Sequence, residues 1–561
     1  MKKKRIRFTI VLSLLAISLV FNLLLIFLNR DTTYNRVVTA ATLFDIEFSK
    51  TEIDSMSNAV LLNKDKYAAI NAYALSNSTS PAFIFSPVPA GYNTPAVQEP
   101  KNFNLPISVK VPLNPENLCY YSVAELSALI KARKITSVEL TKIYLARIKK
   151  FDKELFSVIT LLEESALEQA EHADKEIKAG HYRGPLHGIP YGVKDLLAVK
   201  GFPTTWGSPI FKNQMIHETA SVVEKLDLAG AVLVAKLSLG ELAMDDVWFG
   251  GKTRNPWNTD EGSSGSSAGS SSATSAGLVA FAIGSETWGS IVSPTTVCGV
   301  TGLRPTFGRV SRAGAMALSW TMDKIGPICR NAQDAAIVFN AIYGPDGKDI
   351  TLANKPFNVN LGRTNKKLRV GYIASEFAEK TEINANDFAT LETMKQMGYT
   401  LIPVELPNNL PVEALSIILE AEAAAAFSNL TLLNLDDSMV LQTKNSWPNI
   451  FRTARLIPAV EYIQANRIRT DLIQGLIKMF EQVDIVISPS LEGNQLLITN
   501  LTGHPALSIP NGFDTRGLPT SITFIADWYN EADLLAVGWA FQQKQGFYLN
   551  HPAKFTPKNE K

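Results

Sequence analysis

The chain is poor in the residues that build disulfide frameworks and metal sites. Its 561 residues include only three cysteines and six histidines, and these form no CxxC pair or other pattern with metal-ligand spacing. An odd, sparse set of cysteines argues against a disulfide scaffold, and isolated Cys and His residues argue against zinc. We therefore expect Cys119, Cys298 and Cys329 to be small buried hydrophobic residues, and we expect no metal site.

An excess of charge of one sign is also lacking. Lysine and arginine (54) nearly balance aspartate and glutamate (53), so the formal net charge is +1. Proteins that bind nucleic acid electrostatically usually carry a marked positive excess. Phosphate-binding loops of the GxGxxG or GxxxxGK[ST] type do not occur in the sequence. The sequence thus predicts no nucleic-acid partner and no cofactor, and it leaves the oligomeric state open.

One long hydrophobic run is present, at the N-terminus. After the basic start MKKKRIR comes FTIVLSLLAISLVFNLLLIFL, about 21 residues without a charge, enough for a helix across a bilayer core of about 30 Å. A cleavable signal peptide usually has a shorter apolar region followed directly by a small-residue cleavage site. We predict that residues 1–30 anchor the protein in a membrane with its catalytic domain outside the cytoplasm. Secretion after signal cleavage is the alternative.

The remainder divides into an accessory segment and one large domain. Residues 31–118 contain a helix, opened by the capping-box pattern of Ser49 and Glu52, and then a stretch rich in Pro, Asn and Ser. In residues 119–550, short apolar runs such as AVLVAKL and VDIVISP alternate with helical stretches. This alternation predicts an α/β domain with a largely buried sheet.

The tract GSSGSSAGSSSATSAG, residues 262–277, allows three interpretations. Its composition is typical of a flexible linker, but it runs directly into LVAFAIG, which is typical of a buried strand. It also fits the G-x-S-x-G nucleophile elbow, with Ser267 as nucleophile and His504 as base. An elbow requires a hydrophobic strand before it, and the preceding residues are polar. The third interpretation combines the tract with two other segments.

Those segments are GPLHGIPYGVKDLLAV (184–199) and GSETWGSIVSPTTVCGVTGLRPTFGRVS (284–311). With the Gly/Ser tract between them, the chain resembles the amidase-signature hydrolases from roughly Ser122 to Gln543. The resemblance implies one catalytic domain with a mixed, twisted β-sheet core covered by helices on both faces. It also implies hydrolysis of a carboxamide C–N bond through an acyl-serine intermediate, with a small-molecule or peptide amide as substrate.

The resemblance assigns the nucleophile to Ser290 and the base to Lys194. It assigns the bridging serine to Ser266, which follows a cis peptide bond in a loop of small residues. A serine hydroxyl needs a base during attack. A lysine can serve only in its neutral form, and burial lowers its pKa toward the useful range near 7–8. The apolar neighbours of Lys194 in YGVKDLL suit that requirement. Ser267 is a possible assistant or substrate contact.

The resemblance also implies an oxyanion hole made by the backbone N–H groups of Thr287, Trp288 and Gly289. The sequence departs from the family pattern at two positions. Trp288 stands where glycine is usual, which predicts either a different loop shape or a pocket wall. Val292 replaces an arginine, so we expect Glu286 to lose its usual partner.

Aromatic residues around the presumed site, namely Trp248, Phe249 and Trp288, suggest an apolar or peptide-like acyl group. The sequence thus predicts a membrane-anchored amidase. Two alternatives stay open. One is a glutamine-dependent amidotransferase A-subunit, and the other is a catalytically silent surface-binding protein on the same fold.

Overall fold

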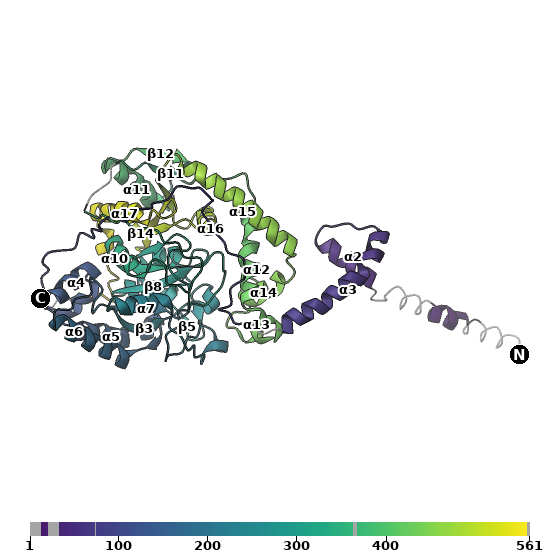
Figure 1. Ribbon diagram of the computed structural model, residues 1–561, viewed down its shortest axis with the longest axis horizontal. Helices are drawn as coiled ribbons and strands as arrows, with labels where there is room; N and C mark the ends of the chain where they lie inside the picture. Colours follow the sequence, from purple (N-terminus) through teal and green to yellow (C-terminus); the bar gives the residue numbers. More distant parts are fainter. Residues whose placement is uncertain (1–9, 11–12, 21–32, 73–74, 363–366, 558–561) are drawn as a thin grey trace. The chain divides into compact units, whose positions relative to one another are not determined.

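The computed structural model describes residues 10, 13–20, 33–72, 75–362 and 367–557. The chain forms two compact units, Met1–Ser76 and Asn77–Lys561, which we describe separately (Figure 1). The boundary between the units falls inside the predicted accessory segment, residues 31–118. Residues 77–118 therefore belong to the same unit as the predicted catalytic domain.

The first unit contains a pair of helices, α2 (Thr33–Leu43) and α3 (Lys50–Ala72), which contact each other. The predicted capping box opens α3: the Glu52 carboxylate accepts hydrogen bonds from the Ser49 N–H at 2.7 Å and from its hydroxyl at 2.8 Å. This local pattern predicted the start of the helix correctly because it depends on neighbouring residues alone.

The predicted membrane anchor is corrected by the structure. Parts of the hydrophobic run, residues 8–9, 11–12 and 21–28, lie outside the described residues. Among the residues that are described, no helix is both long enough and apolar enough to cross a bilayer. The prediction of a membrane-anchored, extracytoplasmic protein is wrong on this finding.

The second unit is built on one sheet of 11 strands. It is mixed: β2 pairs in parallel with β3 and β8, and β11 pairs in parallel with β12 and β13, whereas the other neighbours are antiparallel. In spatial order the strands are β1 (Val158–Leu161), β3 (Val232–Leu237), β2 (Pro190–Lys194), β8 (Phe281–Glu286), β10 (Lys324–Cys329), β9 (Thr301–Arg304), β14 (Ala506–Phe513), β15 (Pro519–Ala526), β13 (Ile485–Pro489), β11 (Val370–Ile373) and β12 (Leu401–Val404).

Both faces of this sheet are covered. Successive residues of a strand point to opposite faces, and in β8 Phe281 and Ile283 belong to one buried cluster while Ala282 belongs to another. The α/β prediction with a doubly covered mixed sheet is thus confirmed. The α-helices of this unit are α4 (Val123–Lys131), α5 (Ser137–Leu155), α6 (Glu163–Lys178), α7 (Ser221–Leu228), α8 (Ala268–Ser275), α9 (Val292–Cys298), α10 (Ala332–Ile342), α11 (Ala385–Gln396), α12 (Ile417–Ala426), α13 (Ser428–Leu432), α14 (Trp447–Ala454), α15 (Ala459–Phe480), α16 (Gln495–Leu501) and α17 (Glu531–Gln545).

Helix α12 contacts both α14 and α15, and the three form a helical group at one side of the sheet (Figure 1). The three cysteines are buried and free, as expected. The parallel neighbours β2 and β8 position the site, because the C-terminal ends of parallel strands lie at the same edge of a sheet.

Candidate active site

Lys194 is the last residue of β2, and its side chain is fully buried. Its amine donates hydrogen bonds to Ser266 Oγ at 2.8 Å, Ser267 Oγ at 3.2 Å and Ser285 Oγ at 3.0 Å. It also approaches the Ser285 carbonyl oxygen at 3.4 Å. The structure thus joins β2, the Gly/Ser tract and β8 at one buried amine, and all of its hydrogen-bond partners are uncharged.

Burial lowers the pKa of Lys194 from 10.5 to about 7, and the negative charges of Asp323 and Glu286 oppose this shift only in part. The next residue, Asp195, does not pair with Lys194, because its carboxylate lies 2.7 Å from Lys236 Nζ. An amine with a pKa near neutrality is uncharged in a substantial fraction of molecules. That is the state in which it can accept a proton.

The Gly/Ser tract is a buried structural element and not a linker. Every residue from 262 to 277 is buried or half-buried, and the second half of the tract is the helix α8. The peptide bond between Gly265 and Ser266 is cis. A Cβ atom at Gly265 would lie 1.7 Å from the Asp245 carbonyl oxygen. Small residues are therefore required where the tract approaches neighbouring backbone.

Ser267 does not have the surroundings of a nucleophile elbow. The preceding strand, β7 (Asn258–Gly262), belongs to a two-stranded ribbon outside the main sheet. The hydroxyl of Ser267 donates to the Ser285 carbonyl at 3.0 Å. His504 is hydrogen-bonded to Thr502 Oγ1 at 2.8 Å, and burial holds its pKa well below the ordinary range. These surroundings disfavour the elbow interpretation.

Ser290 lies in the turn between β8 and α9, directly beside the tract, since its carbonyl oxygen accepts a hydrogen bond from the Ser267 N–H at 3.1 Å. Within the described part of the chain, the Ser290 hydroxyl has no hydrogen-bond partner. The N–H groups of Trp288 and Gly289 have no acceptor among the described residues either. Three consecutive residues thus present a hydroxyl and two unpaired backbone donors.

Trp288 fits into this turn without a glycine-like conformation. The positive φ belongs to Gly289, at +87°, whereas Trp288 is not among the residues with positive φ. The Trp288 side chain is 44% exposed. It does not line the cavity beside the site, to which Trp320 contributes instead. The role of Trp288 as a pocket wall stays a prediction without support from this geometry.

Glu286 has a different arginine partner from the one expected. Glu286 was expected to lose the arginine that Val292 replaces, and Arg304 in β9 is its partner instead: it lies 2.7 Å from the Glu286 carboxylate and is equally buried. Asn500 donates to the same carboxylate at 2.7 Å, and so does the Val292 N–H at 2.9 Å. Burial would raise the pKa of Glu286, but Arg304 and these hydrogen bonds outweigh it and lower the pKa to about 2. Arg304 therefore compensates for the arginine that is missing at position 292.

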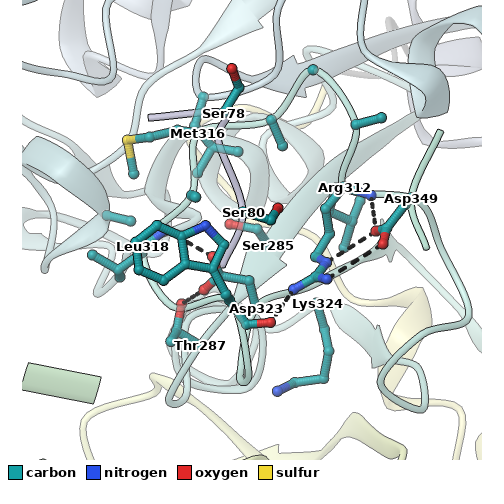
Figure 2. A pocket seen from close by; sticks show the side chains of 18 of the residues that line it. Ser78, Ser80, Ser285, Thr287, Arg312, Met316, Leu318, Asp323, Lys324 and Asp349 are labelled. Atoms are coloured by element: carbon teal, nitrogen blue, oxygen red, sulfur yellow. Dashed lines mark hydrogen bonds and ion pairs between the residues drawn. The ribbon is translucent and has the colours of Figure 1, made fainter. Parts of the chain in front are cut away.

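A cavity of about 240 Å³ opens beside the Lys194 cluster, and Ser285 and Thr287 form part of its wall (Figure 2). The Thr287 hydroxyl donates to Asp323 Oδ1 at 2.6 Å. The other carboxylate oxygen of Asp323 accepts the N–H groups of Leu318 and Ser319 at 2.8 and 3.0 Å. Burial raises the pKa of Asp323, and these bonds oppose that rise. Of the three residues expected to form the oxyanion hole, Thr287 lines this cavity, whereas Trp288 and Gly289 do not.

Two charged residues that line this cavity, Arg312 and Asp349, compensate each other. Arg312 lies 3.1 Å from the Asp349 carboxylate, and it also donates to the Trp320 carbonyl at 2.7 Å. Burial lowers the pKa of Lys324 well below the ordinary range. Figure 2 shows the Arg312–Asp349 pair at one side of the cavity, opposite Leu318 and Thr287.

Trp248 and Phe249 do not line this cavity. Their rings contact each other at 4.9 Å between centroids, and Trp248 Nε1 donates to the Phe156 carbonyl at 3.2 Å. Lys212 lies over the Phe249 ring at 5.3 Å. A role of the two aromatic residues in substrate binding stays a prediction.

Two residues of the site were missed in the sequence analysis. Ser285 lies in the segment that was singled out, but its contact with Lys194 depends on the pairing of β2 with β8. Asp323 lies in MDKIGP, and it reaches Thr287 through the pairing of β10 with β8. Neither residue could be identified as part of the site from its residue type, since serines and aspartates are common. Only the strand order brings them to Lys194 and Thr287.

Comparison with known proteins gives a consistent result. The family model described as Amidase matches residues 139–498. The chain is 34% identical to the A-subunit of the glutamyl-tRNA(Gln) amidotransferase from Acinetobacter baumannii, over 77% of this chain and 97% of that protein. Among solved structures, the native peptide amidase from Stenotrophomonas maltophilia is similar with a TM-score of 0.68 and 28% identity, over 76% of this chain and 97% of that chain. An amidase family protein from Bacillus anthracis has a TM-score of 0.67 and 26% identity, over 76% and 91% of the two chains.

Proposed function

The chain belongs to the amidase family, and from that premise we propose that it hydrolyses a carboxamide through an acyl-enzyme formed on Ser290. The observation that supports this proposal most directly is the hydrogen bond of 2.8 Å between the buried amine of Lys194 and Ser266 Oγ. A neutral lysine in this position can take up a proton, and a serine hydroxyl can accept one hydrogen bond while donating another.

In the proposed reaction, the Ser290 oxygen attacks the amide carbonyl while its proton passes through the Ser266 hydroxyl to Lys194. The unpaired N–H groups of Trp288 and Gly289 would stabilise the negative charge on the carbonyl oxygen. The C–N bond then breaks, and the leaving nitrogen takes the proton back from Lys194 by the same route. Water attacks the acyl-serine with the same proton relay, which releases the carboxylic acid and restores the enzyme.

Ser290→Ala tests this assignment, and Ser267→Ala is its matched control. We expect Ser290→Ala to lose both amide hydrolysis and labelling by a fluorophosphonate probe. Ser267→Ala loses one hydrogen bond to Lys194 and should react more slowly but still be labelled, with the label mapped to Ser290 by mass spectrometry. Labelling of Ser290→Ala at another serine would refute the proposal.

A second candidate is an amidotransferase A-subunit, which would release ammonia from glutamine for a partner. The name and 34% identity of the Acinetobacter relative favour this candidate over a stand-alone amidase. The two candidate functions differ in the amide from which ammonia is released. Ammonia release from glutamine should therefore be compared with release from simple amides. Preference for glutamine would support the amidotransferase candidate. A folded protein that no serine probe labels would instead support the silent binding protein.

A further inference from the structure

A segment outside the residues matched by the family model runs along the candidate active site. We call residues 77–85 the strap. Asn77 fixes its beginning, because the side-chain amide donates to the Ala317 carbonyl at 2.9 Å and accepts from the Ala317 N–H at 2.8 Å. The Phe85 ring fixes the end of the strap. The centroids of the Phe85 and Phe307 rings lie 5.2 Å apart, and the Arg469 guanidinium lies 3.5 Å from the Phe85 centroid.

Between these two fixed ends the strap borders two cavities. Ser78 and Ser80 line the cavity of about 240 Å³ that contains Ser285 and Thr287, and Figure 2 labels both serines among its surrounding side chains. The next residues along the strap, Pro81 and Phe83, line a second cavity of about 480 Å³. Trp320 lines both cavities. The two cavities are therefore neighbours along the strap, and one indole ring borders both.

Apolar side chains of α12 and of the segment after α14 form much of the wall of the second cavity. Its wall includes Ala421, Ala424 and Ala425 of α12, together with Ala454 and Ile457, and its polar members besides Glu422 are Ser428, Arg455 and Tyr462. Short alanine side chains leave room between the helix surface and the strap. Its acidic member, Glu422, is already engaged, because it accepts hydrogen bonds from Ser319 and Thr321.

Phe83 of the strap lines the same cavity as these alanines, and it is 59% exposed. An exposed aromatic ring opposite an apolar wall is stabilised when an apolar group fills the space between them. The neighbouring cavity is lined by Ser285, which accepts a hydrogen bond from Lys194, and by Thr287, which precedes the turn that carries Ser290. The group that fills the space beside Phe83 is then the far end of the same substrate.

We propose that the strap is a specificity element, and that the substrate is an amide whose acyl group passes Trp320 and ends in an apolar group between Phe83 and α12. This proposal rests on the proposed function, because the scissile amide must lie at Ser290. It assigns the polar half of the strap to the reacting end of the substrate and the apolar half to its far end.

The test compares a short and a long straight-chain primary amide, butanamide and decanamide, in the full-length protein. Phe83→Ala should lower kcat/KM for decanamide about tenfold, the effect of removing a modest apolar contact, and leave butanamide unchanged. Ile84→Ala is the matched control, since Ile84 is 55% exposed on the same strap but lines neither cavity. Ile84→Ala should leave kcat/KM unchanged for both amides.

Binding of decanamide should also be measured by calorimetry in the Ser290→Ala background, with and without Phe83→Ala, because binding does not require turnover. Loss of affinity on Phe83→Ala supports the strap even if Ser290 is not the nucleophile. Equal effects of Phe83→Ala on both amides, or equal effects of Phe83→Ala and Ile84→Ala, would overturn the strap proposal. Failure of the wild-type protein to hydrolyse either amide would count against the proposed function alone.

Discussion

At the residue scale, the chemistry depends on how one amine is kept neutral. Lys194 donates hydrogen bonds only to uncharged oxygens. The carboxylate next to it in sequence, Asp195, is paired with Lys236 instead. Burial therefore dominates, and the pKa falls to about 7. The apolar sequence neighbours of Lys194 allowed its burial to be predicted, but the partner of Asp195 lies on another strand and could not be identified.

This pKa predicts the pH dependence of the proposed reaction. The base acts in its neutral form, so kcat/KM should rise about tenfold per pH unit on the acidic side and level off above pH 7. The negative charge of Asp323 raises the pKa of Lys194, so Asp323→Asn should move the acidic limb to lower pH. A pH–rate profile of both proteins measures the shift.

Asp349→Asn is the control for this measurement. Asp349 also lines the cavity, but it is paired with Arg312 and is not among the charges that act on Lys194. Its acidic limb should coincide with that of the wild type. A limb that stays in place in Asp323→Asn, or moves to higher pH, would contradict the assignment of Lys194 as the base.

At the scale of elements, sequence patterns predicted what neighbouring residues determine. The predicted capping box at Ser49 opens α3, and the same sequence pattern at Ser122 and Thr136 opens α4 and α5. The helix α8 was not predicted, because serine and glycine have low helix propensity. Its residues are buried, and packing outweighs that propensity. The same limit applies to Arg304, whose contact with Glu286 depends on sheet order and not on spacing in the chain.

The Glu286–Arg304 pair connects β8, β9 and the start of α9, and we expect it to be important for stability. Removing one partner of a buried pair leaves an uncompensated charge, so Arg304→Met should lower the free energy of unfolding by about 3–5 kcal/mol. The folded-state pKa of Glu286 is about 2, below its ordinary 4.5, so its stabilisation is complete above pH 4.5 and is lost as the pH falls toward 2.

Denaturant unfolding of Arg304→Met, Glu286→Gln and the double variant measures this coupling. The double variant should be less destabilised than the sum of the two single variants, because it leaves no isolated charge. Strict additivity would mean that the two side chains do not interact energetically.

At the scale of the whole molecule, the family resemblance and the α/β alternation predicted the doubly covered sheet. They could not predict the strap, because residues 77–85 contain no periodic pattern and gain their position from contacts with Ala317, Phe307 and Arg469. The cavities were unpredictable for the same reason. Each one is bordered by segments that are far apart in sequence.

The division into two compact units predicts that Asn77–Lys561 folds without the residues before it. This fragment keeps Asn77 and the whole strap, so it should retain the melting temperature of the full chain, fluorophosphonate labelling at Ser290, and the ratio of kcat/KM for decanamide to that for butanamide. A fragment that begins at Phe48 is the control, since it retains α3. If the shorter fragment alone loses labelling or melts at a lower temperature, residues 48–76 stabilise the catalytic unit. If it keeps labelling but loses the preference between the two amides, the strap requires the chain before Asn77 to hold its position.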